Sequence, residues 1–137
     1  MNYFYVISPV GADPNFPSKR LLLEDVGKRC NCKPFFPLDH HGEFSIDSAR
    51  SDLQKAEFVF ADLSDERPSC YFELGFAEAL GKKVTIIATS GTRIHQVGDV
   101  NNICWYSDLE EYRKLILETL ARTGFPECDA AGSNTDY

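Results

Sequence analysis

The feature that most constrains the fold is a short apolar run without polar alternation, FVFA at residues 58–61. A strand that exposes one face alternates apolar and polar residues, so a continuous run indicates a strand buried on both faces. We predict such a strand over residues 57–63 and a second over residues 84–89 (VTIIAT). Strands of this kind are typical of parallel sheets that helices cover on both sides.

The same pattern repeats along the chain. Further strands are predicted over residues 3–8, 33–36 and 103–106. Four helices are predicted between and after these strands. The first begins at a Ser18 cap and has Leu21 facing inward, and the second covers residues 46–55. The third runs from a Ser69 cap to about residue 80, and the fourth from an Asp108 cap to about residue 122. Alternating strands and helices predict an α/β fold, a flavodoxin-like three-layer sandwich with a five-stranded parallel sheet. We expect this domain over residues 1–123 and a flexible C-terminal tail over residues 124–137.

Composition excludes several classes of function. A chain of 137 residues is large enough for one domain with a single core. Its net charge of −7 argues against a nucleic-acid surface, which needs clustered Lys and Arg. No apolar run approaches the roughly 18 residues of a membrane span, and the first residues lead into a strand rather than a signal peptide. We therefore expect a cytoplasmic protein without a nucleic-acid or membrane partner.

The cysteines predict neither a disulfide framework nor a metal site. Five cysteines at irregular spacing are typical of reduced thiols. Cys30 and Cys32 are followed by His40 and His41, but this spacing is not a recognised zinc motif. We expect no metal and no cofactor.

Glu73 is the candidate catalytic residue, because helix periodicity places it on an apolar stripe. Residues three, four and seven apart share one helix face. On the helix from residue 69, that face consists of Ser69, Glu73, Phe76, Ala77 and Leu80. Two other interpretations stay open: a capping box, if the helix boundary shifts by one residue, and an ion pair with Arg67 or Arg93.

The predicted sheet gives the place of a ligand site. Open parallel sheets bind ligands beyond the carboxyl ends of their strands, near the switch in strand order, here between the first and third strands. That rule selects five candidate substrate-binding residues: Ser8, Gly11, Asp62, Asp65 and Ser69. Asp62 has an equally weighted alternative, which is capping neighbouring backbone amides. A carboxylate such as Glu73 at this edge suits attack on an anomeric carbon.

Two segments carry a resemblance to a known family. The run ADLSDERPSCYFELGFAEALGKKV (residues 61–84) resembles the core motif of the nucleoside 2-deoxyribosyltransferase-like superfamily, where an acidic loop precedes a helix beginning with Tyr/Phe-Glu-Leu-Gly. The N-terminal YFYVISPVG (residues 3–11) is similar to that superfamily's first strand and glycine-containing loop. The resemblance, which covers residues 3 to about 120, implies that Glu73 is the nucleophile and that Tyr5 positions it.

The resemblance also marks a departure in the region that reads the base. The superfamily's base-contacting Asp falls on Ala49, so Asp47 and Ser48 beside it are the remaining candidates for substrate binding. A second carboxylate of the family falls near Arg67, where only Asp65 or Glu66 could substitute.

The function implied by the resemblance is an N-glycosidase or 2-deoxyribosyltransferase that cleaves a nucleoside or nucleotide through a Glu nucleophile. The expected partner is a small-molecule nucleoside or nucleotide, and the expected assembly is a homo-oligomer. Two alternatives stay open: a TIR-like NAD glycohydrolase, and a non-catalytic nucleotide-binding or interaction module of the same fold. We favour an enzyme.

Overall fold

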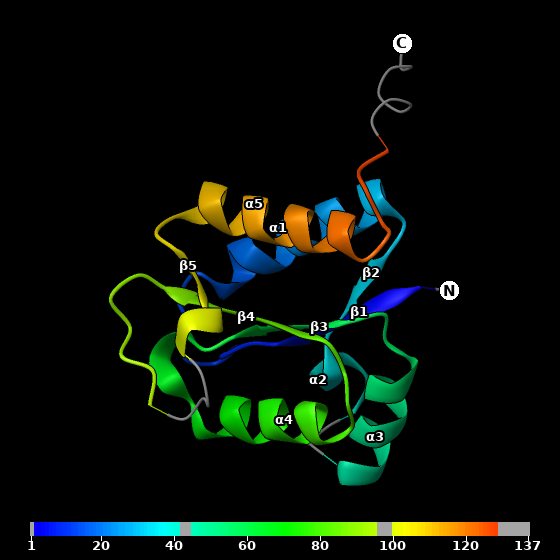
Figure 1. The fold of residues 1–137 in the computed structure, drawn as a ribbon, viewed down its shortest axis with the longest axis vertical. Helices are drawn as coiled ribbons and strands as arrows, with labels where there is room; N and C mark the ends of the chain where they lie inside the picture. The colour runs from blue at the N-terminus through cyan, green and yellow to red at the C-terminus, as the bar shows by residue number, and fades with distance from the viewer. Residues whose placement is uncertain (1, 42–44, 96–99, 129–137) are drawn as a thin grey trace.

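Five parallel strands form one sheet in the computed structural model, which describes residues 2–41, 45–95 and 100–128 (Figure 1). The strands are β1 (Tyr3–Ile7), β2 (Lys33–Phe35), β3 (Val59–Asp62), β4 (Val84–Thr89) and β5 (Cys104–Tyr106). Their order across the sheet is β2-β1-β3-β4-β5, so the direction of winding reverses between β1 and β3. The predicted α/β fold with a five-stranded parallel sheet is confirmed.

Helices cover both faces of this sheet (Figure 1). One face carries α1 (Phe16–Cys30) and α5 (Leu109–Arg122), and the other carries α2 (Pro37–His40), α3 (Ile46–Lys55) and α4 (Pro68–Ala79). Two short 3₁₀ turns, η1 (Ser64–Glu66) and η2 (Val100–Asn102), complete the described elements. In the described part of the chain, no helix combines the length and the apolar character that a membrane crossing requires.

The core consists of two apolar clusters, one on each side of the sheet. Successive residues of a strand point to opposite faces. Phe4 and Val6 of β1 therefore pack in the cluster with α1 and α5, whereas Tyr5 and Ile7 pack in the cluster with α3 and α4. Tyr5 is consequently directed toward the helix that carries Glu73.

Helix α1 differs from its predicted position. It begins at Phe16 rather than after Ser18, and its buried face includes Phe16, Lys19 and Leu23. Lys19 is therefore inside, with 3% exposure, and Leu21 is outside, with 69% exposure. The prediction that Leu21 faces inward is wrong, because buried carboxylates compensate the charge of Lys19.

Residues after α5 pack against the domain. Phe125 contacts the cluster under α1 and α5, and its N–H donates to the Leu120 carbonyl at 2.7 Å. The Cys128 N–H donates to the carbonyl of Arg29 near the end of α1. The predicted tail thus includes ordered contacts over its first residues, and its remaining part, residues 129–137, lies outside the described residues.

Candidate active site

A cavity of about 640 Å³ lies at the carboxyl end of β1. Its walls come from β1 and the loop after it, the start of α1, the α2 region, α3 and the first turns of α4. Cavities of roughly 300–1,000 Å³ are the usual size for small-molecule ligands. The cavity has this size. It adjoins the end of β1, where the strand order changes between β1 and β3, and open parallel sheets bind ligands at such a change.

Glu73 lines this cavity from the second turn of α4. The helix begins at Pro68 with Arg67 at the N-cap position, and no side chain caps it. The prediction that Ser69 caps this helix is wrong, because Pro68, whose fixed φ fits the first helical position, already begins the helix and makes Ser69 its second residue. Glu73 consequently lies beyond the third helical position, which rules out the capping box.

Tyr5 is the hydrogen-bond partner of Glu73. The hydroxyl of Tyr5 donates to Glu73 Oε2 at 3.1 Å, and Tyr5 itself is 1% exposed. Over the described ranges, Glu73 forms no ion pair with Arg67 or Arg93. The predicted contact between a tyrosine of the first strand and this carboxylate is therefore present in the structure.

The surroundings of Glu73 change its acidity. Burial raises the pKa of Glu73 to about 7, and the hydrogen bond from Tyr5 opposes part of that rise. Burial and the nearby Glu73 also raise the pKa of Tyr5 well above its usual value, so Tyr5 stays protonated and remains a donor. A carboxylate that is half-ionised near neutral pH and poorly solvated is suited to nucleophilic or acid–base chemistry.

Three further candidates line the same cavity: Ser8, Gly11 and Ser69. The Oγ of Ser8 is buried and has no hydrogen-bond partner among the described residues. A buried hydroxyl without a partner costs free energy unless a ligand or water satisfies it. Ser8 is therefore well placed to contact a bound molecule.

The other candidates lie away from the cavity wall: Asp47, Ser48, Asp62 and Asp65. Asp47 is exposed at the start of α3 and pairs with Arg50 at 3.1 Å. The Ser48 N–H donates to the Oγ of Ser45, which caps α3. Asp65 is exposed and has a positive φ of 68° in the turn before α4.

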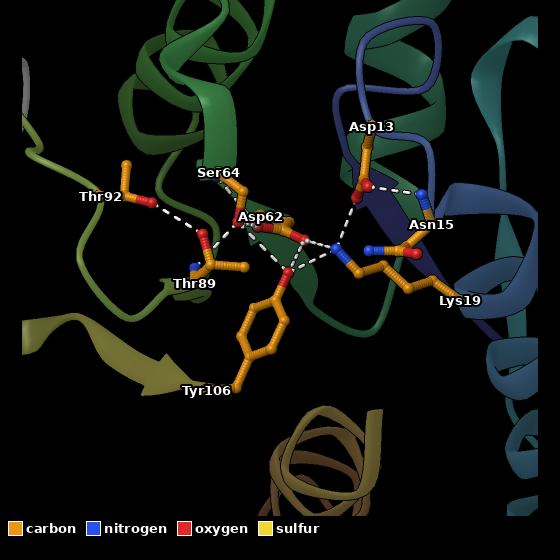
Figure 2. Close-up of polar contacts among 8 residues, drawn as sticks. All are labelled: Asp13, Asn15, Lys19, Asp62, Ser64, Thr89, Thr92 and Tyr106. Carbon is orange, nitrogen blue, oxygen red and sulfur yellow. Dashed lines mark hydrogen bonds and ion pairs between the residues drawn. The ribbon is translucent and has the colours of Figure 1, made fainter. Parts of the chain in front are cut away.

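Asp62 is held in a buried polar network rather than at the cavity (Figure 2). Its Oδ1 accepts hydrogen bonds from the N–H and the Oγ of Ser64, at 3.0 and 2.6 Å. Its Oδ2 accepts from the hydroxyl of Tyr106 at 2.7 Å and from Lys19 Nζ at 3.3 Å. The backbone contact to Ser64 agrees with the alternative in which Asp62 caps neighbouring amides.

Lys19 is the cation of this network. Its Nζ lies 2.5 Å from Asp13 Oδ2 and donates to the Tyr106 hydroxyl at 2.6 Å (Figure 2). Burial acts to lower the pKa of Lys19, but attraction to Asp62 and the hydrogen bonds to Asp13 and Tyr106 outweigh it and raise the pKa. The network joins the loop after β1 to the ends of β3 and β5, and so supports the loop that forms one cavity wall.

The structure also brings His41 and Asp52 to the cavity, which the sequence interpretation did not pair. His41 Nε2 and Asp52 Oδ2 are 2.9 Å apart, and both residues line the cavity. Asp52 follows Ala49 by three residues, so the two share one face of α3. That spacing is the signal that could have identified Asp52. Across the described residues, no group of three His, Cys, Asp or Glu side chains is arranged to hold a metal ion.

Comparisons with known proteins agree with this fold. No protein-family model matches the chain, and no curated protein matches it. Solved structures do match, and those described here are two 2-deoxyribosyltransferases and a CMP N-glycosidase that share this α/β fold. A 2-deoxyribosyltransferase from Bacillus psychrosaccharolyticus aligns with a TM-score of 0.61 at 18% identity, over 91% of this chain and 96% of the other.

Two further structures are similar at comparable levels. A 2-deoxyribosyltransferase from Leishmania mexicana aligns with a TM-score of 0.53 at 20% identity, over 76% of this chain and 83% of the other. A CMP N-glycosidase from Clostridium botulinum aligns with a TM-score of 0.56 at 16% identity, over 84% and 98% of the two chains. At these identities the comparisons show a shared fold.

Proposed function

We propose that this protein cleaves the N-glycosidic bond of a nucleoside or nucleotide, with Glu73 as the nucleophile. The observation that carries the proposal is the Glu73 carboxylate, which is partly buried in a ligand-sized cavity and accepts a hydrogen bond from Tyr5. The fold it shares with two 2-deoxyribosyltransferases and a CMP N-glycosidase supports the same substrate class.

The chemistry follows from the position of the carboxylate. In the anionic form, an oxygen of Glu73 attacks the anomeric carbon, and the electron pair of the C–N bond leaves with the base. The product is a glycosyl ester on Glu73. Water then releases the sugar in a hydrolase, or a second base accepts it in a transferase. The Tyr5 hydrogen bond holds the carboxylate in one orientation, which lowers the entropic cost of the attack.

A substrate panel tests the proposal. Purified protein is incubated with ribo- and deoxyribonucleosides, their 5′-monophosphates and NAD, and free base is measured by chromatography with and without a second base. We expect release from at least one nucleoside or 5′-monophosphate. Release of nicotinamide from NAD alone would support the TIR-like alternative, and tight binding without any product would support a binding module.

Tyr5→Phe tests the partner of the nucleophile. Because the Tyr5 hydrogen bond lowers the pKa of Glu73, its removal raises that pKa further above about 7. The active form is the anion, so the activity of the wild type should rise with pH through about 7, and that of the variant should rise at higher pH. At neutral pH we expect a loss on the order of 10- to 100-fold, the usual worth of a hydrogen bond to a charged group.

The pH profile of base release for the two proteins provides the measurement. Tyr112→Phe is the matched control, since Tyr112 is also buried but packs in the cluster with α1 and α5, and its hydroxyl has no hydrogen-bond partner among the described residues. An unchanged profile for Tyr5→Phe would contradict the assigned role of Tyr5.

A further inference from the structure

The pair formed by His41 and Asp52 has no role in the steps described so far, although it lines the same cavity as Glu73. His41 follows α2 and Asp52 belongs to α3, so the contact between His41 Nε2 and Asp52 Oδ2 joins two elements across the cavity wall. The side chains are 33% and 21% exposed, which leaves both accessible to a ligand.

Asp52 also lies near the reacting groups. The charge of Asp52 contributes to the raised pKa of Tyr5, the residue that donates to Glu73. The cavity therefore contains two carboxylates in different settings. Glu73 is held by a phenol, and Asp52 is held by an imidazole. Pairs of titratable groups in contrasting environments are the usual arrangement for divided catalytic roles.

The proposed reaction needs a second group of this kind. A nucleobase is a poor leaving group as an anion, so its departure is faster when an acid protonates it. Ala49, at the position where the resemblance implies a base-contacting Asp, has no polar side chain. Ala49 lines the cavity one turn before Asp52, so a base that lay against Ala49 would be next to the His41–Asp52 pair.

We propose that His41, oriented by Asp52, is the acid that protonates the departing nucleobase; this inference rests on the proposed function. Asp52 binds Nε2, and in the described part of the chain Nδ1 has no hydrogen-bond partner, so Nδ1 is the ring nitrogen left to donate to the base. A carboxylate that binds one ring nitrogen fixes the orientation of the other, as in acid–base pairs generally.

The atoms balance over two steps. In the first, a Glu73 oxygen bonds to the anomeric carbon, the C–N bond breaks, and the electron pair left on the base takes the proton from Nδ1 of the His41 imidazolium. In the second, the neutral His41 removes a proton from water as the water oxygen attacks the anomeric carbon. The Glu73 carboxylate and the imidazolium are thereby restored, and the net reaction is hydrolysis.

The test compares leaving groups of different acidity on the sugar that the panel selects. The two substrates are the natural base and its fluorinated counterpart, a 5-fluoropyrimidine or 2-fluoropurine, whose anion is more stable. We expect His41→Ala and His41→Gln to lower release of the natural base on the order of 10²-fold or more, the worth of general acid catalysis. Fluorination of the base should increase the rate of release by a factor about ten times larger in the variants than in the wild type.

The controls separate this role from a structural one. His41→Gln keeps a donor for Asp52, so a folding defect of the Ala variant does not decide the outcome. His40→Ala is the matched control: His40 stacks on Phe35 and is not part of the cavity wall, and it should behave as the wild type. If the His41 variants lost the same factor of activity on both substrates, or lost no activity, the role of His41 would be overturned but the proposed function would not. Absence of base release by the wild type across the panel would overturn the proposed function itself.

Discussion

Glu73→Gln should lower the rate of base release by on the order of 10³-fold or more, because removal of a nucleophile eliminates the covalent route. Glutamine has nearly the same shape and keeps an oxygen that accepts from Tyr5, so the cavity should be preserved. The measurement is single-turnover release of base from the best substrate of the panel. Mass spectrometry of the wild type should in addition detect the glycosyl ester on Glu73.

Glu78→Gln is the matched control for this variant. Glu78 is on the same helix but exposed, so the same change of residue should leave the rate within the scatter of the wild type. Comparable losses in the two variants would show that the helix as a whole tolerates no change. Full activity of Glu73→Gln would exclude Glu73 as the nucleophile.

The stability of Glu73→Gln provides an independent measurement with a defined sign. Burial raises the pKa of Glu73 from 4.5 to about 7, so the native state binds this proton more tightly than the unfolded state does. The stability from this group is complete below pH 4.5 and is lost as the pH rises through about 7. The Gln variant has no such loss. Relative to the wild type, it should therefore gain on the order of 1–3 kcal/mol between pH 4 and pH 8.

Lys19→Met should lower the free energy of unfolding by about 3–5 kcal/mol, the usual cost of leaving buried charges without their partner. Lys19 is 3% exposed and contacts both Asp13 and Asp62, which are themselves buried (Figure 2). Methionine fills a similar volume, so the loss reports the charge rather than a cavity. Chemical denaturation at pH 7 measures the effect.

Two comparisons make this prediction specific. Lys28→Met makes the same change on an exposed turn of α1 and should alter stability by less than about 0.5 kcal/mol. Adding Asp13→Asn and Asp62→Asn to Lys19→Met removes the uncompensated charges, so the triple variant should recover part of the loss. If the losses of stability from the three single substitutions simply added in the triple variant, the ionic explanation would be wrong.

The fold could be predicted from the sequence because its signals are local. The apolar run at residues 58–61 and the spacing of residues on each helix report burial, and the alternation of strands and helices leaves few topologies. The same reasoning placed Glu73 on an inward face, and the resemblance at residues 3–11 and 61–84 connected it with Tyr5. Strand β1 and helix α4 bring these two side chains to 3.1 Å from positions 68 residues apart.

The errors come from contacts that local sequence patterns do not report. Hydrophobicity alone places Leu21 inside and Lys19 outside, since a lone lysine is costly to bury. Asp62 at the end of an apolar strand has the pattern of a ligand residue, but Lys19, Ser64 and Tyr106 use both of its oxygens. These contacts join residues that are distant in the chain, and no periodicity reports them.

The sequence by itself therefore determined the fold class, the edge of the sheet at which the cavity lies and the carboxylate that lines it, because each depends on spacing along one element. Only the tertiary structure decided which polar residues meet. It took Asp62 out of the cavity, buried Lys19, and placed His41 beside Asp52, since those contacts depend on how separate elements pack together.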